Sequence, residues 1–543
     1  MVAFFTAGLI LATAGCSKNN DVASIADTGS DGPTTAITAV VHSVGNATSG
    51  KDVYSFETFG NEKFWTDAMR LPAGILAKSF TPVQALQAGL SVDSVAFTNA
   101  TNISAQTKSD ILAELQTNLS AASAPLLNNV NTTIALINAN AIIGVVPKDT
   151  NGVAGIDVAG GDKVGATCAL CHTITDASVF NLPNGGSIGV RLDGRAVHNL
   201  NFGAVLALAD NSRAYYPVLQ LNLAANGNTT LGRAPLADAI TETSTEAQVD
   251  AYLSNPAYYP IGMFDDTFDG NGDPMHNSPL LRTDLAAPWG TEGAIARLDN
   301  FSNLVYTGLL DPTGITTPAG RAFLNKLGGA AGDEIVNDYV AVLAATGVTG
   351  YPFVTAVGAA SAVSGTEEAP LGVRVDNQKL IDMNAYLNSL QAPSGVVADA
   401  ASAERGRQKF RTTICTTCHN VDQSKPVPAF IVSMLSIFPG DNPVQLATRT
   451  PPLNPVLNTV NNIFDDKMAV VNASIRGEIR GEAMPLLLDL ARKPNFLHDN
   501  SVPTLDSLLN PSRGTTAPHP FYLSDAAQRA DMVEFLRGLD TTP

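Results

Sequence analysis

The sequence predicts a mainly α-helical protein, and three of its features support this fold class. Apolar residues recur at spacings of three and four, most clearly from Val375 to Gln391, where Leu380, Met383, Leu387 and Leu390 share one face. Strand-like alternation of apolar and polar residues is sparse and short. Long stretches rich in Gly, Pro and Asn separate the helical segments, as is usual where a bound cofactor supplies part of the core.

The length and composition indicate a globular protein with more than one domain. A chain of 543 residues is too long for a single hydrophobic core, so we expect two or three domains. Hydrophobic residues make up 45% and charged residues 15%, which is typical of a folded chain. The formal net charge of −18 argues against nucleic acid as the partner, because phosphate binding needs concentrated positive charge. A basic partner protein, attracted electrostatically, is compatible with this charge.

The first residues resemble an export signal of the bacterial lipoprotein type. Residues 2–14 are apolar and small and lead into Gly15 and Cys16; this run fits a signal peptide and is too short to span a membrane. Thr13 stands where lipoprotein signals usually have Leu, and no Lys or Arg precedes the apolar run. We expect residues 1–16 to be the signal of an exported protein, periplasmic or anchored to the outer membrane or cell surface of a bacterium. Cys16 is the candidate lipid anchor.

The next residues are expected to form a linker and then a helical extension. Residues 17–35 are polar and small, which is typical of a flexible tether. Residues 36–150 show helical spacing with few charges from Ile103 to Ala121 and from Leu126 to Ile143. We expect these helices to form a shell packed on the domain that follows.

Residues 151–393 are expected to form the first of two larger domains. Pro147 to Gly161 is rich in glycine and turn-like, and the chain then continues into a motif at Cys168. A second irregular stretch runs from Asn255 to Pro279. The helix from Val375 to Gln391 must end before Pro393, so the domain boundary is expected between residues 393 and 399.

Residues 399–543 are expected to form the second domain. Asp399 is the expected N-cap of a helix that runs to about Phe410 and leads to a second motif at Cys415. A closing helix is expected from Asp525 to Leu539, with Ser524 as its N-cap. The apolar face of that helix would carry Met532, Phe535, Leu536 and Leu539.

Two Cys-x-x-Cys-His motifs carry the chemistry of this chain, one at Cys168, Cys171 and His172 and one at Cys415, Cys418 and His419. Cysteines three residues apart lie on one side of a helical turn, so both thiols can bond to the same edge of one haem. The adjacent His then lies beneath the iron and supplies its proximal nitrogen. The motifs therefore predict two haem c groups, with His172 and His419 as iron ligands.

Two other interpretations of the motifs have less support. A redox-active Cys-x-x-Cys pair is one, and half of a zinc site is the other, but neither motif has a second Cys pair close by. Two chance occurrences of this motif are very rare in a chain with five Cys and seven His. Apart from Cys16, no cysteine is left for a disulfide. We therefore expect two cytochrome c-like haem domains with long loops and an N-terminal helical extension.

The second axial ligand of each iron must be sought among the remaining His and Met residues. For the C-terminal haem the candidates are Met484 and His498. For the N-terminal haem the candidate is His198, with Met263, Met275 and His276 further along the chain. If none of these binds the first iron, that iron has an open position, which a peroxidase or an oxygenase needs.

Three segments in the C-terminal part carry a family resemblance: Thr450 to Asn454, Phe496 to Leu505, and the closing helix from Gln528 to Leu539. Together they resemble the di-haem cytochrome c peroxidase superfamily, and most closely its rubber-oxygenase branch. The resemblance covers residues 401–543. It is weaker around the first motif and from Trp289 to Asn300, and it is absent from the first residues of the chain.

This resemblance implies one ligand and one open site. In the rubber-oxygenase branch the His of the Phe-Leu-His segment is the distal ligand of the C-terminal haem, which implies His498 here. In the peroxidases a Met further along the chain takes that place, and no Met stands just after His498. The same branch implies an open iron at the N-terminal haem. A haem with two His ligands has a lower reduction potential than one with His and Met.

The segment from Trp289 to Asn300 resembles the inter-haem segment of the family and offers three candidate catalytic residues. Glu292 would move a peroxide proton, and Arg297 would stabilise the departing charge. Trp289 would relay electrons. The ordinary interpretation is that Arg297 and Asp299 pair with each other or with haem propionates.

Three more basic residues, Arg191, Arg195 and Lys493, have two interpretations of the same kind. Each is either a ligand for a haem propionate or an ordinary surface charge beside a turn.

Two functional hypotheses follow from the motifs. The first is an exported di-haem c-type cytochrome that transfers electrons through two covalently bound haems to a redox partner protein. The alternative is a di-haem peroxidase or oxygenase that reacts with a small oxidant at the first haem and stores electrons on the second. No specific feature supports a sensor or a purely structural haem protein. Fold resemblance alone does not choose between the first two.

Overall fold

The computed structural model describes most of the chain from Val44 to Asp540, all of it within one unit, Ala39–Pro543. The predicted signal, Cys16, the predicted linker, Cys418 and His419 lie outside the described residues. The description covers residues 44–228, 232–266, 268–272, 274–283, 289, 295, 297–357, 362–413, 415, 487–497, 499–515, 517 and 519–540, without the side chains of 326–328.

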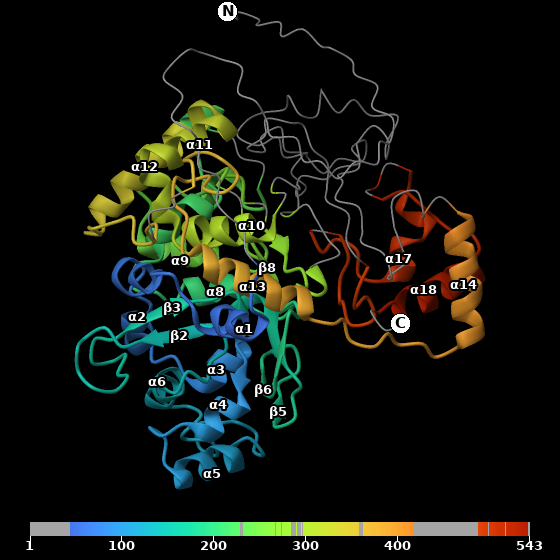
Figure 1. The fold of residues 1–543 in the computed structure, drawn as a ribbon, viewed down its shortest axis with the longest axis horizontal. Helices are drawn as coiled ribbons and strands as arrows, with labels where there is room; N and C mark the ends of the chain where they lie inside the picture. The colour runs from blue at the N-terminus through green and yellow to red at the C-terminus, as the bar shows by residue number, and fades with distance from the viewer. Residues whose placement is uncertain are drawn as a thin grey trace, which may run out of the picture. The chain divides into compact units, whose positions relative to one another are not determined.

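The described residues form many short helices and a few very short strands (Figure 1). The α-helices are α1 (Ala47–Phe56), α2 (Leu71–Ala77), α3 (Pro82–Gln87), α4 (Ser94–Asn99), α5 (Ala105–Glu114), α6 (Val130–Asn138), α7 (Ala169–His172), α8 (Phe202–Leu206), α9 (Glu246–Leu253), α10 (Leu298–Leu304), α11 (Pro318–Gly328), α12 (Ala330–Ala345), α13 (Asn377–Ser389), α14 (Ala400–Thr412), α17 (Leu505–Leu508) and α18 (Ala526–Arg537). Helical turns of other types include η1 (Phe64–Ala68), η2 (Ser212–Val218), η6 (Val305–Leu309) and η7 (Pro312–Thr316).

The prediction of a mainly α-helical fold is confirmed. The strands are β1 (Val92–Asp93), β2 (Val145–Lys148), β3 (Lys163–Ala166), β4 (Thr173–Thr175), β5 (Phe180–Asn181), β6 (Ser187–Gly189), β7 (Arg191–Asp193), β8 (Met263–Phe264) and β9 (Met275–His276). Antiparallel pairs join β2 to β3, β4 to β7, and β8 to β9. A three-stranded sheet has the order β1-β6-β5. These small sheets hold loop segments of the chain together.

The helix predicted from Ile103 to Ala121 is shorter than expected. It begins at Ala105, where the Ser104 hydroxyl caps it, and it ends at Glu114. Beyond this point the Thr117 hydroxyl donates to the Glu114 carbonyl at 2.7 Å, and the Asn118 side chain accepts from the Ser120 amide at 3.1 Å. Such local hydrogen bonds compete with the bonds of a continuing helix, so the polar residues after Glu114 form turns.

The helix predicted from Leu126 to Ile143 is also shorter. It spans Val130–Asn138, with the Asn129 side chain as its cap. Asn140 follows with a φ of 53°, in the left-handed region that commonly ends a helix. The apolar run then continues into β2. One apolar run in the sequence therefore covers both a helix and a strand.

One hydrophobic core joins the N-terminal extension to the first motif. Tyr54 of α1 and Trp65 of η1 belong to the same cluster of buried residues as Ala169 and Leu170 of α7. Helix α1 lies directly against α13: a Cβ atom built on Gly50 would lie 1.9 Å from the Asp382 carbonyl oxygen. A larger residue at position 50 would therefore push these helices apart.

The helix predicted from Val375 to Gln391 is confirmed as α13. The Asp376 carboxylate caps it by accepting from the amides of the second and third residues of the helix, Gln378 and Lys379. Leu380 and Leu387 are buried on the predicted face.

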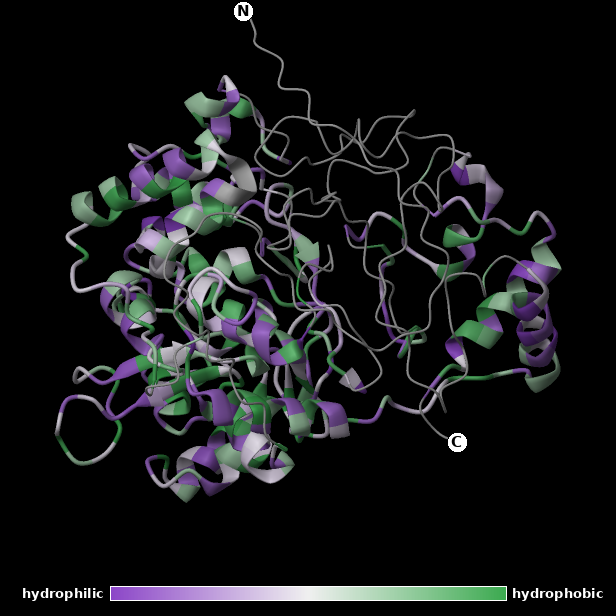
Figure 2. Cartoon of the chain, turned by 45° about the horizontal axis from the view of Figure 1, so that its top comes forward, coloured by the Kyte–Doolittle hydropathy of each residue, from purple (hydrophilic) through white to green (hydrophobic). Residues whose placement is uncertain are grey.

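A second, smaller core holds α14 and α18 together. The predicted N-cap Asp399 is confirmed for α14, whereas the predicted Ser524 cap is wrong by one residue, because the Asp525 carboxylate accepts from the first amides of α18. Most of α14 is hydrophilic (Figure 2), and it turns Gly406 and Phe410 inward. The Phe410 ring lies 5.4 Å from the Phe535 ring.

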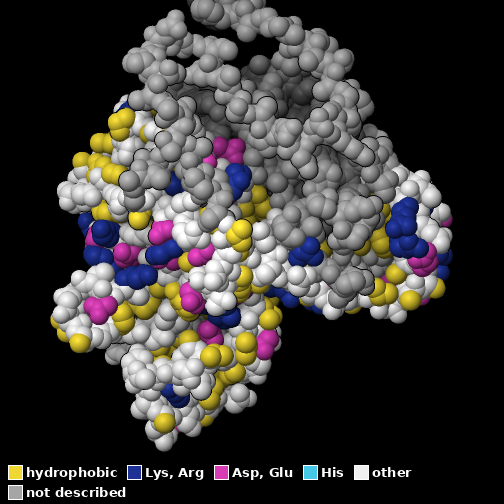
Figure 3. Space-filling view, in the orientation of Figure 1, with side chains coloured by type: hydrophobic (Ala, Val, Ile, Leu, Met, Phe, Trp, Pro, Cys, Tyr) yellow, Lys and Arg dark blue, Asp and Glu magenta, His cyan; other side chains and the backbone are white. Residues whose placement is uncertain are grey.

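Charges of both signs lie side by side on the visible face of the described residues (Figure 3). Among the described residues, Lys78 pairs with Asp250 at 3.0 Å and Arg321 pairs with Asp333 at 3.3 Å. In the part of the chain that the structure describes, no helix is long and apolar enough to cross a membrane.

Candidate functional site

The first Cys-x-x-Cys-His motif lies on a single helical turn between two strands. Strand β3 leads into α7, and β4 follows His172 directly. The Thr167 amide donates to the Gly144 carbonyl at 3.1 Å, which fixes the start of the turn. Gly144 has a φ of +79°, and a Cβ atom there would lie 2.2 Å from the Leu170 nitrogen, so only glycine fits this close approach.

The motif opens on a cavity in the described part of the chain. Cys168, Cys171 and His172 all line it, and most of the other lining side chains are Leu or Phe. Pockets for small molecules and cofactors typically have mostly apolar walls with a few polar groups. The two thiols and the imidazole therefore face a mostly apolar cavity of the kind that binds an apolar cofactor.

The His172 ring is oriented by a backbone carbonyl. Its Nδ1 lies 2.8 Å from the Ser278 oxygen. A carbonyl can only accept, so Nδ1 carries the proton and Nε2 keeps a free lone pair. Burial lowers the pKa of His172 to about 4, so the ring stays neutral near pH 7. This is the tautomer and charge state that an iron ligand requires.

The two thiols do not have the properties of a redox-active pair. Burial raises the pKa of the Cys168 thiol to about 11 and that of the Cys171 thiol to about 12. Reactive Cys-x-x-Cys pairs instead have a lowered pKa, because the thiolate is the nucleophile. Among the described residues, no three His, Cys, Asp or Glu side chains lie close enough together to hold a metal ion. The raised pKa values therefore argue against thiol exchange at this motif.

Helix α10 and the π-helical turn η6 form one wall of the cavity, which the sequence reasoning did not identify. Leu298, Phe301 and Val305 line it at helical spacing, a signal that a search for apolar periodicity from residue 298 would have found. Tyr306 is fully buried, and its hydroxyl lies 3.4 Å from the Cys168 sulfur. Short π-helical turns occur often at functional sites.

Two polar side chains in the cavity wall were also missed. Asp266 follows β8, and Ser302 lies on α10; both line the cavity among Leu and Phe residues. Asp266 lies in a run rich in Asp and Gly that reads as an ordinary turn. A carboxylate in such a place can accept and donate a proton.

His198 belongs to a segment whose backbone runs beside the motif, but its side chain does not line the described cavity. The Val197 amide donates to the Cys171 carbonyl at 3.0 Å, so the backbone of this segment runs beside the motif. The neighbouring charges of the His198 ring are those of Lys493 and Asp489. Met263 and Met275 are buried in the β8–β9 pair, and His276 Nε2 lies 2.9 Å from Lys493 Nζ. None of these four side chains lines the described part of the cavity.

The free energy of unfolding is expected to fall under mildly acidic conditions because of His198. Burial, with a smaller effect of Lys493, lowers the pKa of His198 from 6.5 to about 4. Between these values the unfolded chain binds a proton that the folded chain does not. The contribution of His198 is therefore complete above the unfolded pKa and is lost as the pH falls toward 4. At about 1.4 kcal/mol per pKa unit the loss is at most ~3.5 kcal/mol.

Urea unfolding at several pH values between neutrality and the lowered pKa measures this effect. The variant His198→Gln should show a flatter pH dependence than the natural chain in that window. An identical pH dependence in the two proteins would contradict a lowered pKa at His198.

The described candidate catalytic residues, Trp289 and Arg297, do not line the cavity themselves. Trp289 packs on the main core, with its ring 6.5 Å from that of Phe301 in the cavity wall. Arg297 is half exposed, and its Nε donates to Asp299 Oδ1 at 3.1 Å. Arg297 therefore pairs with Asp299 as the ordinary interpretation expects. Glu292 lies outside the described residues.

A buried ion pair lies behind the α10 wall. Arg374 Nη2 donates to Asp299 Oδ2 at 2.6 Å, and each side chain is 1% exposed. Arg374 Nη1 also donates to Asn300 Oδ1 at 2.7 Å. Asp299 and Asn300 alternate along α10 with residues that line the cavity, so this pair fixes the helix that forms the wall.

The other three basic residues make contacts with protein groups. Arg191 pairs with Asp193 at 3.2 Å, and Arg195 pairs with Asp489 at 3.0 Å. Lys493 lies 2.9 Å from His276 Nε2 and 6.0 Å above the Phe496 ring.

The second motif is described only at Cys415. This half-buried thiol follows α14, packs against the smaller core and lies 3.2 Å from the Thr413 hydroxyl. Phe496 and Val502 pair through backbone hydrogen bonds of 2.7 and 3.3 Å. The predicted ligands His498 and Met484 lie outside the described residues, as do Cys418 and His419.

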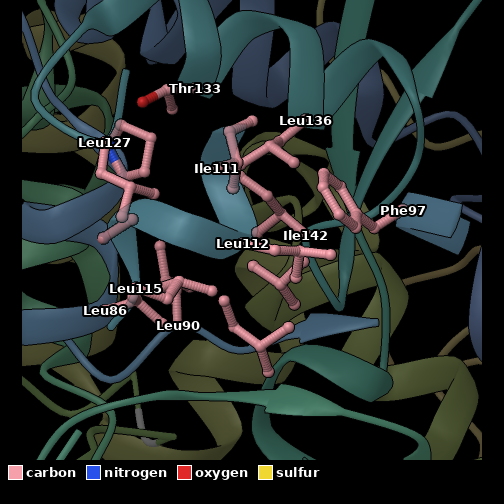
Figure 4. Close-up of a pocket in the computed structure, with 14 residues that line it drawn as sticks. Leu86, Leu90, Phe97, Ile111, Leu112, Leu115, Leu127, Thr133, Leu136 and Ile142 are labelled. Carbon is pink, nitrogen blue, oxygen red and sulfur yellow. The ribbon is translucent and has the colours of Figure 1, made fainter. Parts of the chain in front are cut away.

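A second, small cavity lies among α3, α5 and α6 in the extension (Figure 4). Leu86, Ile111 and Leu136 are among its apolar lining residues. Thr133 is the exception, and its hydroxyl donates to the Phe80 carbonyl at 2.7 Å. This cavity therefore offers apolar contacts and no free polar group from its described lining.

Comparisons with known proteins assign no family to the chain. No protein-family model matches it, and no curated protein matches it. A solved structure of Kuenenia stuttgartiensis hydrazine synthase pressurized with 20 bar xenon is similar at 13% sequence identity, covering 60% of this chain and 91% of that chain. The TM-score of 0.24 is too low to indicate a shared fold.

Proposed function

We propose that this chain is an exported di-haem c-type cytochrome that transfers electrons through two covalently attached haems. Cys168 and Cys171 would bond the first haem, and His172 would be its proximal ligand. Cys415, Cys418 and His419 would have the same roles at the second. A bound haem supplies reversible one-electron chemistry; the chain supplies attachment, orientation of the ligand and exclusion of water.

One observation carries this proposal: both thiols and the imidazole of one helical turn face the same mostly apolar cavity. The Ser278 carbonyl supports it by leaving His172 Nε2 free to bind iron. The second haem rests on the repeated motif, on α14 and on the resemblance to the di-haem peroxidase superfamily. That resemblance also makes His498 the proposed distal ligand there, with Met484 as its competitor.

The direct test is the haem content of the chain produced in a host that matures c-type cytochromes. Intact mass and the pyridine haemochrome spectrum should give two covalent haems per chain. Peptide mapping should find them on the two motifs. A chain that matures without covalent haem would overturn the proposal.

Export and partner belong to the same proposal. The apolar N-terminal run supports export to a bacterial periplasm or cell surface, with Cys16 as lipid anchor, and the acidic charge supports a basic redox partner protein. Labelling with a radioactive fatty acid would detect the anchor, and Cys16→Ser should abolish the label.

A second candidate function is that of a peroxidase or oxygenase acting at the first haem. One observation favours it: apart from His172, the described lining of the first cavity contains no His, Met or Lys that could bind iron from the other side. Asp266 and Ser302 offer polar groups in that lining. The second haem would then supply electrons to the first.

Spectroscopy separates the two functions. A high-spin signal in electron paramagnetic resonance, and a change in absorption on adding cyanide or peroxide, are expected if the first iron has an open position. Because His198 does not line the described cavity, His198→Ala should leave both haem spectra unchanged. Two purely low-spin haems that react with neither cyanide nor peroxide would leave electron transfer as the sole function. The loss of one low-spin signal in His198→Ala would identify His198 as an iron ligand.

A further inference from the structure

The strand pair β4–β7 places a buried ion pair beside the first motif. Thr173, the residue directly after His172, pairs in register with Asp193, and Thr175 pairs with Arg191. Arg191 Nε and Nη2 each lie 3.2 Å from Asp193 Oδ1. The side chains are 12% and 5% exposed, so water screens these charges poorly.

Hydrogen bonds connect this ion pair to the backbone of His172. The Thr173 hydroxyl donates to Asp193 Oδ1 at 2.9 Å. The Tyr54 hydroxyl lies 2.9 Å from the Thr173 hydroxyl and donates to the His172 carbonyl at 2.6 Å. Tyr54 is completely buried. These contacts come from α1, β4 and β7, so three separate segments hold the residue that carries the proximal imidazole.

The other oxygen of the carboxylate is fixed from a fourth segment. Tyr386 of α13 donates its hydroxyl to Asp193 Oδ2 at 2.7 Å, and its ring lies 5.7 Å from that of Tyr54. Arg191 Nη2 also donates to the Ser55 hydroxyl at 3.0 Å. Both charges are thus held in place, which a tuning role requires and a mobile surface pair lacks.

We propose that the Arg191–Asp193 pair, linked to His172 through Thr173 and Tyr54, tunes the reduction potential of the first haem and positions its proximal ligand. The inference rests on the proposed function, because it needs a haem on His172. Oxidised iron carries one more positive charge than reduced iron. A nearby carboxylate therefore favours the oxidised state and lowers the potential, and a nearby guanidinium raises it.

Redox titration of the two-haem protein, followed by absorption, tests the charge effect with two variants of opposite sign. Asp193→Asn removes the negative charge beside Arg191, so the remaining positive charge should raise the reduction potential of the first haem. Arg191→Gln removes the positive charge beside Asp193, so the remaining negative charge should lower that potential. The potential of the second haem, assigned in a variant whose first motif lacks both cysteines, should not move. Asp333→Asn, which breaks a distant and more exposed Arg–Asp pair, should move neither potential.

Tyr54 and Asp193 are positioning residues, and two further readouts test that role. Tyr54→Phe should shift the iron–histidine vibration of the first haem in resonance Raman spectra. Tyr258→Phe is the matched control, because it removes a hydroxyl that donates to Asp238 at 2.6 Å away from the cavity lining. Asp193→Glu keeps the charge and should restore a potential close to that of the natural protein.

Two results would overturn the inference. One is a first-haem potential that stays constant in both charge variants; the other is a shift of the same sign in both. If Asp193→Asn fails to fold, Tyr386→Phe removes one donor from the carboxylate and should lower the potential; an unchanged potential then contradicts the role. A chain with no haem on Cys168 and Cys171 is recognised by its mass and overturns the proposed function, and this inference with it.

Discussion

Replacing Cys168 and Cys171 together with Ala is expected to halve the covalent haem of the protein, from two groups per chain to one. Both thiols face the same cavity, and no other described cysteine lines it, so nothing there can replace the two lost bonds. His172 alone would hold haem only by an exchangeable bond to iron. Intact mass after denaturation, together with the pyridine haemochrome spectrum, measures the loss.

Cys16→Ser is the matched control, because it changes the fifth cysteine and should leave two haems per chain. The single variants should each keep a haem bonded through one thiol, with a shifted haemochrome band. Two covalent haems in the double variant would place the attachment somewhere other than the first motif.

Replacing Asp299 with Asn is expected to lower the free energy of unfolding by about 3–5 kcal/mol, because it leaves the buried Arg374 guanidinium without its counter-charge. The pair is 2.6 Å apart, and each side chain is 1% exposed. Urea unfolding followed by circular dichroism measures the change. The cavity wall on α10 should loosen at the same time, which would appear as a broader absorption band of the first haem.

Two variants sharpen this test. Asp333→Asn breaks the pair with Arg321, whose side chains are 43% and 37% exposed, and should cost less than about 1 kcal/mol. Asp299→Leu combined with Arg374→Met replaces the whole pair by apolar groups and should recover much of the loss, since no buried charge remains. A loss of under about 1 kcal/mol in Asp299→Asn would show that the pair contributes no more than a surface pair.

Local signals predicted the helices where chemistry and periodicity agree. The apolar face from Leu380 to Leu387 and the cap at Asp399 are of this kind, and both are confirmed. Periodicity failed where polar side chains bond to nearby backbone, as after Glu114, and where a left-handed Asn140 turned a helical run into a strand. In these places the apolar pattern is the same as in a continuous helix. Local hydrogen bonds, which the pattern does not reveal, determine where the helix ends.

The motif residues that line the first cavity could be identified from the sequence, but the walls of the cavity could not. Cys168, Cys171 and His172 are adjacent in sequence and define one turn. The cavity wall comes from α10 and η6, more than 120 residues away along the chain, and from Asp266. Arg191 was interpreted without Asp193, as a propionate ligand or a surface charge near a turn, because only the register of β4 with β7 places both residues beside His172.

The core that joins α1 to the first motif has a consequence for how the protein is made. Tyr54 is completely buried against the backbone of His172, and Cys168 lies against the buried Tyr306. An enzyme that attaches haem would have to reach both thiols, and each of them is partly covered by this core. Under the proposed function, we therefore expect haem to be attached more efficiently to the unfolded chain than to the folded one.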